Sequence, residues 1–372
     1  MGHLLSARQL RGALWLAAFV LGAAGCSSAS NGSGGAGGSD GADSGAGGGG
    51  VHAPSGLPAP PTSGVAQPVG TPGNLKVLDW AGFKSAVTYT LDDAQPSQIE
   101  HYAELQATGA HMTYYITTAN NGEAGYDATF TRAVGDGHEM GNHTVHHCQS
   151  NLTNCSAGSA TSLDGEIDDC NTYITGHFGQ PAVWTAASPY GDTGYDNPDM
   201  SRFLLNRGVQ GGTVAPGDST DPFNLPCHAA VSGETVDSFN SAIDAAHGAG
   251  RWLIFLVHTM TPTTANWYAP IDVSVVTGSV GHAQGLGDVW VDTMVNVGAY
   301  WRAQKVVAAV TPTPSGTSQT WTWTLPAHFP PGKFLRVTVD GGKPSQNGVA
   351  LDWDSHGYYE VALDAGSLTL SP

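Results

Sequence analysis

The sequence predicts a parallel α/β barrel or sheet, followed by a small domain built from β-strands alone. Segments typical of strands and of helices alternate between residues 75 and 310, which is the pattern of parallel α/β proteins. The run WLIFLV at residues 252–257 is apolar throughout, as expected for a strand buried on both faces. Beyond Val310 apolar residues recur with period two, which indicates half-buried strands.

Local patterns place the elements of the alternating part. β-branched and aromatic residues predict further strands at residues 84–91, 111–117 and 182–186. Apolar residues at helical spacing predict helices at residues 96–107, 128–134, 162–177, 197–206, 235–247 and 289–304. Pro96 near a helix start and Gly248 after a helix end are typical boundary residues.

The C-terminal part, residues 311–372, is expected to form a small domain resembling a β-sandwich. Period-two alternation predicts strands at residues 319–325, 334–340 and 357–363. The domain is rich in aromatic residues, namely Trp321, Trp323, Trp353, Tyr358 and Tyr359. Exposed aromatics could stack on sugar rings, but the period-two spacing puts both Trp321 and Trp323 on one face, as in a core. We therefore favour a packing role.

The N-terminus has the features of an export signal. Arg8 and Arg11 precede a short apolar stretch that ends Ala-Ala-Gly-Cys at Cys26, as in a signal peptide. This end resembles a bacterial lipobox, although Ala23 stands where leucine is usual. We expect a signal peptide at residues 1–25 and a lipidated Cys26. The Gly/Ser-rich segment 26–72 is then a disordered linker.

The expected location is therefore the bacterial cell envelope, with the lipid as the only membrane attachment. If the lipobox is not used, the protein would be secreted. The 372-residue chain leaves a catalytic domain at residues 73–310 besides the small C-terminal domain. Its formal net charge of −18 makes nucleic acid an unsuitable partner, because an acidic surface repels phosphates.

Four cysteines besides Cys26 suit an exported protein with two disulfides. They are Cys148, Cys155, Cys170 and Cys227. Three pairings are possible, and we favour Cys148–Cys155 with Cys170–Cys227. A zinc finger is a poor interpretation because no CxxC spacing occurs.

Chemically active residues follow three predicted strands or turns. Asp92 and Asp93 end the first strand, His143 and His147 follow a glycine-rich segment, and His258 ends the run at 252–257. In barrel enzymes such strand ends gather at one face and form the active site. On a helix or helical turn, histidines four residues apart share one face. Adjacent aspartates reach one site only if the chain turns where the strand ends.

Two histidines and a carboxylate are a suitable ligand set for Zn²⁺ or another divalent ion. Fe²⁺ in an oxygenase uses the same ligand types but usually in another order. Each feature alone has a structural interpretation: the histidine pair as a solvated cluster, Asp-Asp as a turn or helix cap, and His258 as a core residue.

Together, these segments resemble the polysaccharide deacetylase family, also called the NodB-homology domain or carbohydrate esterase family 4. The family's motifs correspond, in order, to Thr90-Leu91-Asp92-Asp93, His143-Thr144-x-x-His147, Ala187-Ser188-Pro189-Tyr190 and Leu256-Val257-His258. The resemblance covers roughly residues 80 to 305 and implies a distorted (β/α) barrel of the NodB-homology type.

The resemblance implies a role for each residue that matches a motif. Asp93, His143 and His147 would bind the metal, most commonly Zn²⁺, with Co²⁺ or another divalent ion as alternatives. Asp92 would be the general base, and His258 would protonate the departing amine. Pro189, Tyr190 and Leu256 would contact the substrate, an acetylated polysaccharide or oligosaccharide. The Tyr190 N–H would stabilise the oxyanion.

The sequence departs from the family at two places. Ala187 stands where the family has an arginine that orients the base, and we expect Arg207 to replace it. The acidic residue that orients the acid histidine is also unclear, and Asp218 and Asp221 are the candidates. N-deacetylation is the leading prediction; the alternatives are an O-acetyl esterase of the acetylxylan type and a non-catalytic glycan-binding lipoprotein.

Overall fold

The structure is a computed structural model that describes residues 55–265 and 267–372. The expected signal peptide, Cys26 and the first part of the expected linker lie outside the described residues. Within the described ranges, no helix has the length and apolar character needed to cross a membrane.

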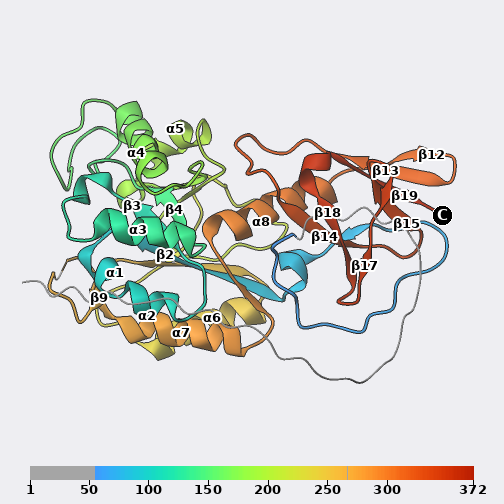
Figure 1. Ribbon diagram of the computed structural model, residues 1–372, viewed down its shortest axis with the longest axis horizontal. Helices are drawn as coiled ribbons and strands as arrows, with labels where there is room; N and C mark the ends of the chain where they lie inside the picture. Colours follow the sequence, from blue (N-terminus) through green and yellow to red (C-terminus); the bar gives the residue numbers. More distant parts are fainter. Residues whose placement is uncertain (1–54, 266) are drawn as a thin grey trace, which may run out of the picture. The chain divides into compact units, whose positions relative to one another are not determined.

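A curled parallel sheet forms the centre of the larger domain, as predicted (Figure 1). Its strands are β2 (Ser85–Asp92), β3 (Thr113–Ile116), β4 (Glu139–Asn142), β5 (Thr185–Ala187), β6 (Leu205–Arg207), β7 (His228–Ala229), β8 (Trp252–Val257) and β11 (Val289–Val291). The order is β6-β5-β4-β3-β2-β8-β7, and β11 pairs with the first residues of β2. This arrangement confirms the prediction of a distorted (β/α) barrel.

Helices connect these strands and cover the sheet. They are α1 (Pro96–Glu100), α2 (Tyr102–Gln106), α3 (Tyr126–Gly135), α4 (Leu163–His177), α5 (Asp196–Met200), α6 (Val236–Gly248), α7 (Val273–Gly285) and α8 (Met294–Ala308). Figure 1 shows α6 and α7 running side by side along the sheet, where they contact each other extensively.

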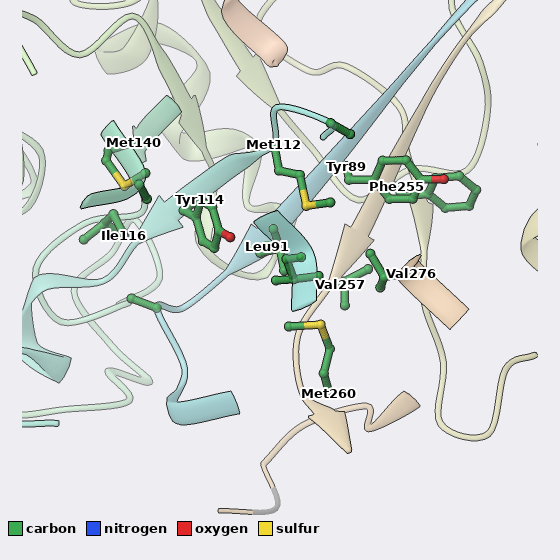
Figure 2. Packing of buried hydrophobic residues seen from close by; sticks show 14 of the residues in the cluster. Tyr89, Leu91, Met112, Tyr114, Ile116, Met140, Phe255, Val257, Met260 and Val276 are labelled. Carbon is green, nitrogen blue, oxygen red and sulfur yellow. The ribbon is translucent and has the colours of Figure 1, made fainter. Parts of the chain in front are cut away.

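The apolar run in β8 is buried on both faces, as its sequence predicted. Leu253, Phe255 and Val257 belong to one hydrophobic cluster, and Trp252, Ile254 and Leu256 to the other. Figure 2 shows the first cluster, where the Tyr89 ring of β2 stacks on Phe255 with centroids 5.1 Å apart. Packing of β2 and β8 through their side chains fixes the strand ends that carry Asp92 and His258.

Some predicted elements were wrong in type or extent. The expected helix 289–304 is β11 followed by α8, because Thr293 caps the helix by accepting a hydrogen bond from the N–H of Asn296. The expected helix 197–206 ends at Met200, and its last residues form β6. The strand β4 and the helix α7 were not predicted.

The C-terminal part folds into two antiparallel sheets. One has the order β1-β14-β18-β17 and the other β12-β13-β19-β15-β16. Their bounds are β1 (Lys76–Val77), β12 (Thr313–Ser315), β13 (Ser318–Thr322), β14 (Phe334–Thr338), β15 (Lys343–Gln346), β16 (Val349–Ala350), β17 (Trp353–Asp354), β18 (Tyr358–Ala362) and β19 (Ser367–Ser371). Trp321 and Trp323 are buried in its core, as expected.

Residues 55–72 were expected to belong to a disordered linker, and this was wrong. The segment follows the C-terminal sheets, where Val65 donates its N–H to Ser355 and accepts a hydrogen bond from the Trp353 indole. The buried guanidinium of Arg336 donates to the carbonyls of Leu57 and Pro58. These polar contacts order a segment whose composition alone indicated disorder.

One of the two favoured disulfides is present. Cys148 and Cys155 are bonded, whereas Cys170 and Cys227 are free and buried. Cys170 lies on α4 in the first hydrophobic cluster, and Cys227 lies in the second. The two thiols thus belong to different hydrophobic clusters and are not bonded to each other, so the expected Cys170–Cys227 pairing was wrong.

Candidate active site

The two adjacent aspartates reach the same site because the chain turns sharply where β2 ends. Asp92 is the last residue of β2, and Asp93 and Ala94 follow with φ angles of 74° and 53°. This left-handed backbone is uncommon for residues other than glycine. It overcomes the alternation of a strand, which would have directed the two carboxylates to opposite faces.

Asp93, His143 and His147 converge as a possible metal site. Their ligand atoms all lie within 4.8 Å of one another. The Nε2 atoms of His143 and His147 lie 3.4 Å and 3.6 Å from the same Asp93 oxygen, Oδ1. The histidines were expected on a helical turn, but His143 follows β4 and positive φ angles at Thr144 and His147 bend the chain back.

Hydrogen bonds orient both imidazoles toward this point. His143 Nδ1 lies 2.7 Å from the carbonyl oxygen of Ala187, and His147 Nδ1 lies 3.1 Å from Ser156 Oγ. With Nδ1 protonated and donating, Nε2 of each ring carries the lone pair that a metal needs. The donor set therefore fits a divalent metal with two nitrogen ligands and one oxygen ligand.

The electrostatics of these groups also favour a cation. Burial alone would raise the pKa of Asp93, but its hydrogen bond to His143 and the neighbouring histidines lower it. Burial lowers the pKa of His147 to about 4, so this ring is neutral at ordinary pH. The pKa of His143 is raised, because Asp92 and Asp93 outweigh the effect of burial. Positive charge is thus stabilised between the two aspartates.

Arg207 takes the place of the missing arginine at position 187. In the sheet it lies directly beside Ala187, as its register partner on β6. Its guanidinium is fully buried and donates to Asp92 Oδ2, which confirms the expectation from sequence. Asp92 Oδ1 is also buried and has no hydrogen-bond partner among the described residues. One oxygen is therefore fixed by a cation, and the other is free to accept a proton.

His258 follows β8 and lines the same cavity as Asp92, Asp93, His143 and His147. Its ring meets Tyr268 edge-on, with centroids 4.9 Å apart, and burial lowers its pKa. Its Nδ1 is buried without a hydrogen-bond partner in the described part of the chain.

Asp218 and Asp221 do not orient His258, so this prediction was wrong. Asp218 accepts hydrogen bonds from the N–H groups of Ala215 and Thr220, and Asp221 accepts from Phe223. Both carboxylates are thereby used within their own loop, as is common for aspartates in turns.

A cavity of about 480 Å³ joins these groups. Asp92, Asp93, His143, His147 and His258 all line it, together with Tyr190 and Leu256. Its remaining wall is mostly apolar, formed by Val209, Ala229, Ala230 and Val231. Pro189 is buried outside the lining, where it precedes the left-handed Tyr190 (φ 58°). Ser156 and Tyr268 also line the cavity; no motif indicated either residue.

Comparisons with known proteins agree with this site. Residues 82–203 match the family described as polysaccharide deacetylase. This range includes the first three motifs, while Leu256-Val257-His258 follows it. The comparison with curated proteins gave no match. The match thus shows a similarity to this family over residues 82–203.

Solved structures with low sequence identity were also found. A Mycobacterium smegmatis protein named for the same family is 14% identical, with 68% of this chain and 99% of that chain covered and a TM-score of 0.44. The catalytic domain of a peptidoglycan N-acetylglucosamine deacetylase from Eubacterium rectale is 14% identical, with coverage of 58% and 91% and a TM-score of 0.39. The Xyl-CE4 domain of a multidomain xylanase, from the hindgut metagenome of Trinervitermes trinervoides, is 18% identical, with coverage of 57% and 88% and a TM-score of 0.38.

Proposed function

We propose that the protein is a metal-dependent hydrolase that removes acetyl groups, with N-acetyl groups as the first choice, from an extracellular or cell-surface polysaccharide. The observation that carries this proposal is the convergence of Asp93, His143 and His147 beside Asp92, whose Oδ2 lies 3.8 Å from His143 Nε2. These groups share a cavity of about 480 Å³. Its apolar wall suits the acetyl methyl group, and its polar floor suits the amide.

Asp93, His143 and His147 would hold the metal, with Zn²⁺ as the first choice and Co²⁺ or another divalent ion as alternatives. When bound, such an ion lowers the pKa of a water and polarises an acyl oxygen. The protein supplies two fixed imidazoles and one ionised carboxylate, which is the usual composition of a hydrolytic zinc site.

Asp92 would act as the general base through Oδ1. The ion pair with Arg207 holds the carboxylate in place. The unpaired oxygen can then take the proton of the water that attacks the acetyl carbon. Arg207 fixes the base but does not contact the reacting atoms, so it is a positioning residue.

His258 would donate a proton to the sugar nitrogen as the carbon–nitrogen bond breaks. Its place in the same cavity as the metal ligands suits this role, and burial makes its protonated form a stronger acid. The Tyr190 N–H would stabilise negative charge on the acyl oxygen. The products are acetate and a free amino sugar.

Export to the bacterial envelope through Cys26 remains a prediction from sequence. It suits the reaction, because acetylated structural polysaccharides lie outside the cell membrane. The Cys148–Cys155 disulfide agrees with an oxidising compartment.

Acetate release by the purified protein tests the proposal. Chito-oligosaccharides, peptidoglycan and acetylxylan would be compared, each with Zn²⁺ and with a chelator. We expect metal-dependent release from an N-acetylated substrate, and its loss in Asp92→Asn. Release from acetylxylan alone would identify an O-acetyl esterase instead. Polymer binding without release, unchanged by the chelator, would support a glycan-binding protein and contradict the proposal.

A further inference from the structure

We propose that the Cys148–Cys155 disulfide and Ser156 form a brace that positions His147 as a metal ligand. The inference rests on the proposed function, because it concerns the same metal site. It assigns roles to a disulfide and a serine outside the four motifs.

Peptide bonds and the disulfide connect His147 to Ser156 by a short covalent path. Cys148 follows His147 in the chain, and Cys155 precedes Ser156. The disulfide closes the loop between them, with a sequence separation of seven residues. It therefore holds the backbone of Ser156 close to that of His147, and Ser156 Oγ lies 3.1 Å from His147 Nδ1.

A chain of hydrogen bonds continues from this contact. Tyr190 Oη donates to the carbonyl of Asn154 at 2.6 Å, and Ser156 Oγ lies 3.4 Å from Tyr190 Oη. Because Tyr190 uses its proton on Asn154, Ser156 can bridge both neighbours only by donating to Tyr190 and accepting from His147. In this arrangement the proton of His147 is on Nδ1, which leaves Nε2 free for the metal.

Further contacts fix the loop against the segment that carries Tyr190. The N–H and hydroxyl of Ser150 donate to Asp192 Oδ2 at 2.9 Å and 2.8 Å. Tyr195 Oη donates to the carbonyl of Cys148 at 2.8 Å. The first half of the loop is therefore anchored to the segment that also carries Tyr190.

His147 needs such support because its backbone is in the left-handed region, with φ 51°. A residue in this region persists only where its surroundings hold it. His143, by contrast, is oriented by the backbone carbonyl of Ala187 on β5. One histidine ligand is thus fixed by the sheet, and the other by a disulfide-closed loop.

The affinity for Zn²⁺ tests this brace without depending on catalysis. It would be measured by competition with a chelator of known affinity for wild type, Ser156→Ala, Cys148→Ala/Cys155→Ala and the triple variant. Loss of a contact behind a metal ligand typically weakens binding about 10- to 100-fold, and we expect this range for Ser156→Ala. Ser156→Thr, which keeps the hydroxyl, should restore most of the affinity.

The effects of the disulfide and of Ser156 on the affinity for Zn²⁺ should be coupled. We expect the cysteine double variant to weaken binding, and the triple variant to be weaker than wild type by less than the product of the two separate factors. Thr153→Ala is the matched control, since the Thr153 hydroxyl bonds, among the residues that the structure describes, to Gln149 and Asn151 within the same loop. Thermal unfolding of the metal-free variants would show whether they fold.

Wild-type affinity in folded Ser156→Ala would overturn the role of Ser156. If the triple variant lost Zn²⁺ affinity by the full product of the two separate factors, the coupling between Ser156 and the disulfide would be wrong. If wild type itself bound no Zn²⁺, the proposed function would fail, and this result is distinct from both others.

Discussion

The short strand β4 has a histidine at each end, and the two differ in what their ring nitrogens contact. At its start, His138 uses both: Nδ1 accepts from the N–H of Met112 at 3.0 Å, and Nε2 lies 2.6 Å from Gln106 Oε1. At its end, His143 uses Nδ1 on the Ala187 carbonyl, while Nε2 faces Asp93. Both ring nitrogens of His138 therefore have partners, as in a core histidine. His143 uses Nδ1 in the same way, but its Nε2 remains available to a metal.

The carboxylates near the two ends differ in the same way. Glu139 accepts hydrogen bonds from Thr113, Thr185 and the N–H of Val295, so both of its oxygens are paired. Asp92 has one oxygen on Arg207 and one without a partner in the described part of the chain. Buried polar groups are normally satisfied. Both ends of β4 are buried, so burial does not distinguish the end at the candidate active site from the other end. The hydrogen bonds of the nearby carboxylates do.

The largest expected effect is the loss of catalysis in Asp92→Asn. Because the amide cannot accept the proton of the attacking water, acetate release should fall about 100- to 10,000-fold. Metal content should remain that of wild type, since Asp92 is not among the three proposed ligands. Activity and bound metal would be measured on the same preparation. Loss of the metal together with activity would show that Asp92 is a ligand, contrary to the account.

Arg207→Ala should weaken both stability and activity. Removing one partner of a buried ion pair leaves the other charge uncompensated, which costs about 3–5 kcal/mol. Arg202→Ala is a useful control, since Arg202 pairs with the more exposed Asp164 and Asp168 and exposed pairs contribute about 0–1 kcal/mol. Urea unfolding and acetate release would be compared. Equal activity of Arg207→Ala and wild type would contradict the positioning role.

The buried His138 predicts how the free energy of unfolding changes with pH. Burial lowers the pKa of His138 to about 4, against about 6.5 in an unfolded chain. Between these values the unfolded chain binds a proton that the folded protein does not, so the free energy of unfolding falls as pH decreases. We expect this histidine alone to remove about 3 kcal/mol from pH 6.5 to 4.

Chemical unfolding of His138→Gln at several pH values would measure that contribution. The variant should lose part of the decrease seen in wild type between pH 6.5 and 4. An unchanged slope would show that other groups cause it.

The smallest effects sharpen the contrast between the two histidines. His138→Gln should cost about 1–3 kcal/mol of stability, because it disturbs a buried hydrogen-bonded position, and should leave Zn²⁺ binding unchanged. His143→Gln should remove Zn²⁺ binding with a smaller loss of stability. Metal titration and thermal unfolding of both variants would be compared. If folded His138→Gln no longer bound Zn²⁺, the distinction between His138 and His143 would be wrong.

Sequence was sufficient for the features that depend on local chemistry. The apolar run of β8, the β-branched run of β2 and the clustering of Asp93, His143 and His147 all follow from pattern and motif. Arg207 could also be anticipated, because it begins the segment 207–210, which was expected to lead a strand into the site. Its exact partnership with Asp92 depends on the register of β5 and β6, which sequence does not give.

Other features depend on long-range packing and were missed. Cys170 and Cys227 lie in different hydrophobic clusters and do not form the disulfide that cysteine counting suggested. Residues 55–72 are ordered by Arg336, which lies far away in the sequence. Residues 289–304 have helical spacing throughout, but the cap at Thr293 divides them into a strand and a helix. Ser156 has no motif, and only the disulfide-closed loop brings it to His147.

The most direct test of the account is to locate the metal itself. Anomalous diffraction at the zinc edge, on crystals grown with Zn²⁺, would show where the ion binds. The account predicts one peak within bonding distance of His143 Nε2, His147 Nε2 and the Asp93 carboxylate. A peak elsewhere, or none at this site in crystals of an enzyme that releases acetate with Zn²⁺, would contradict it.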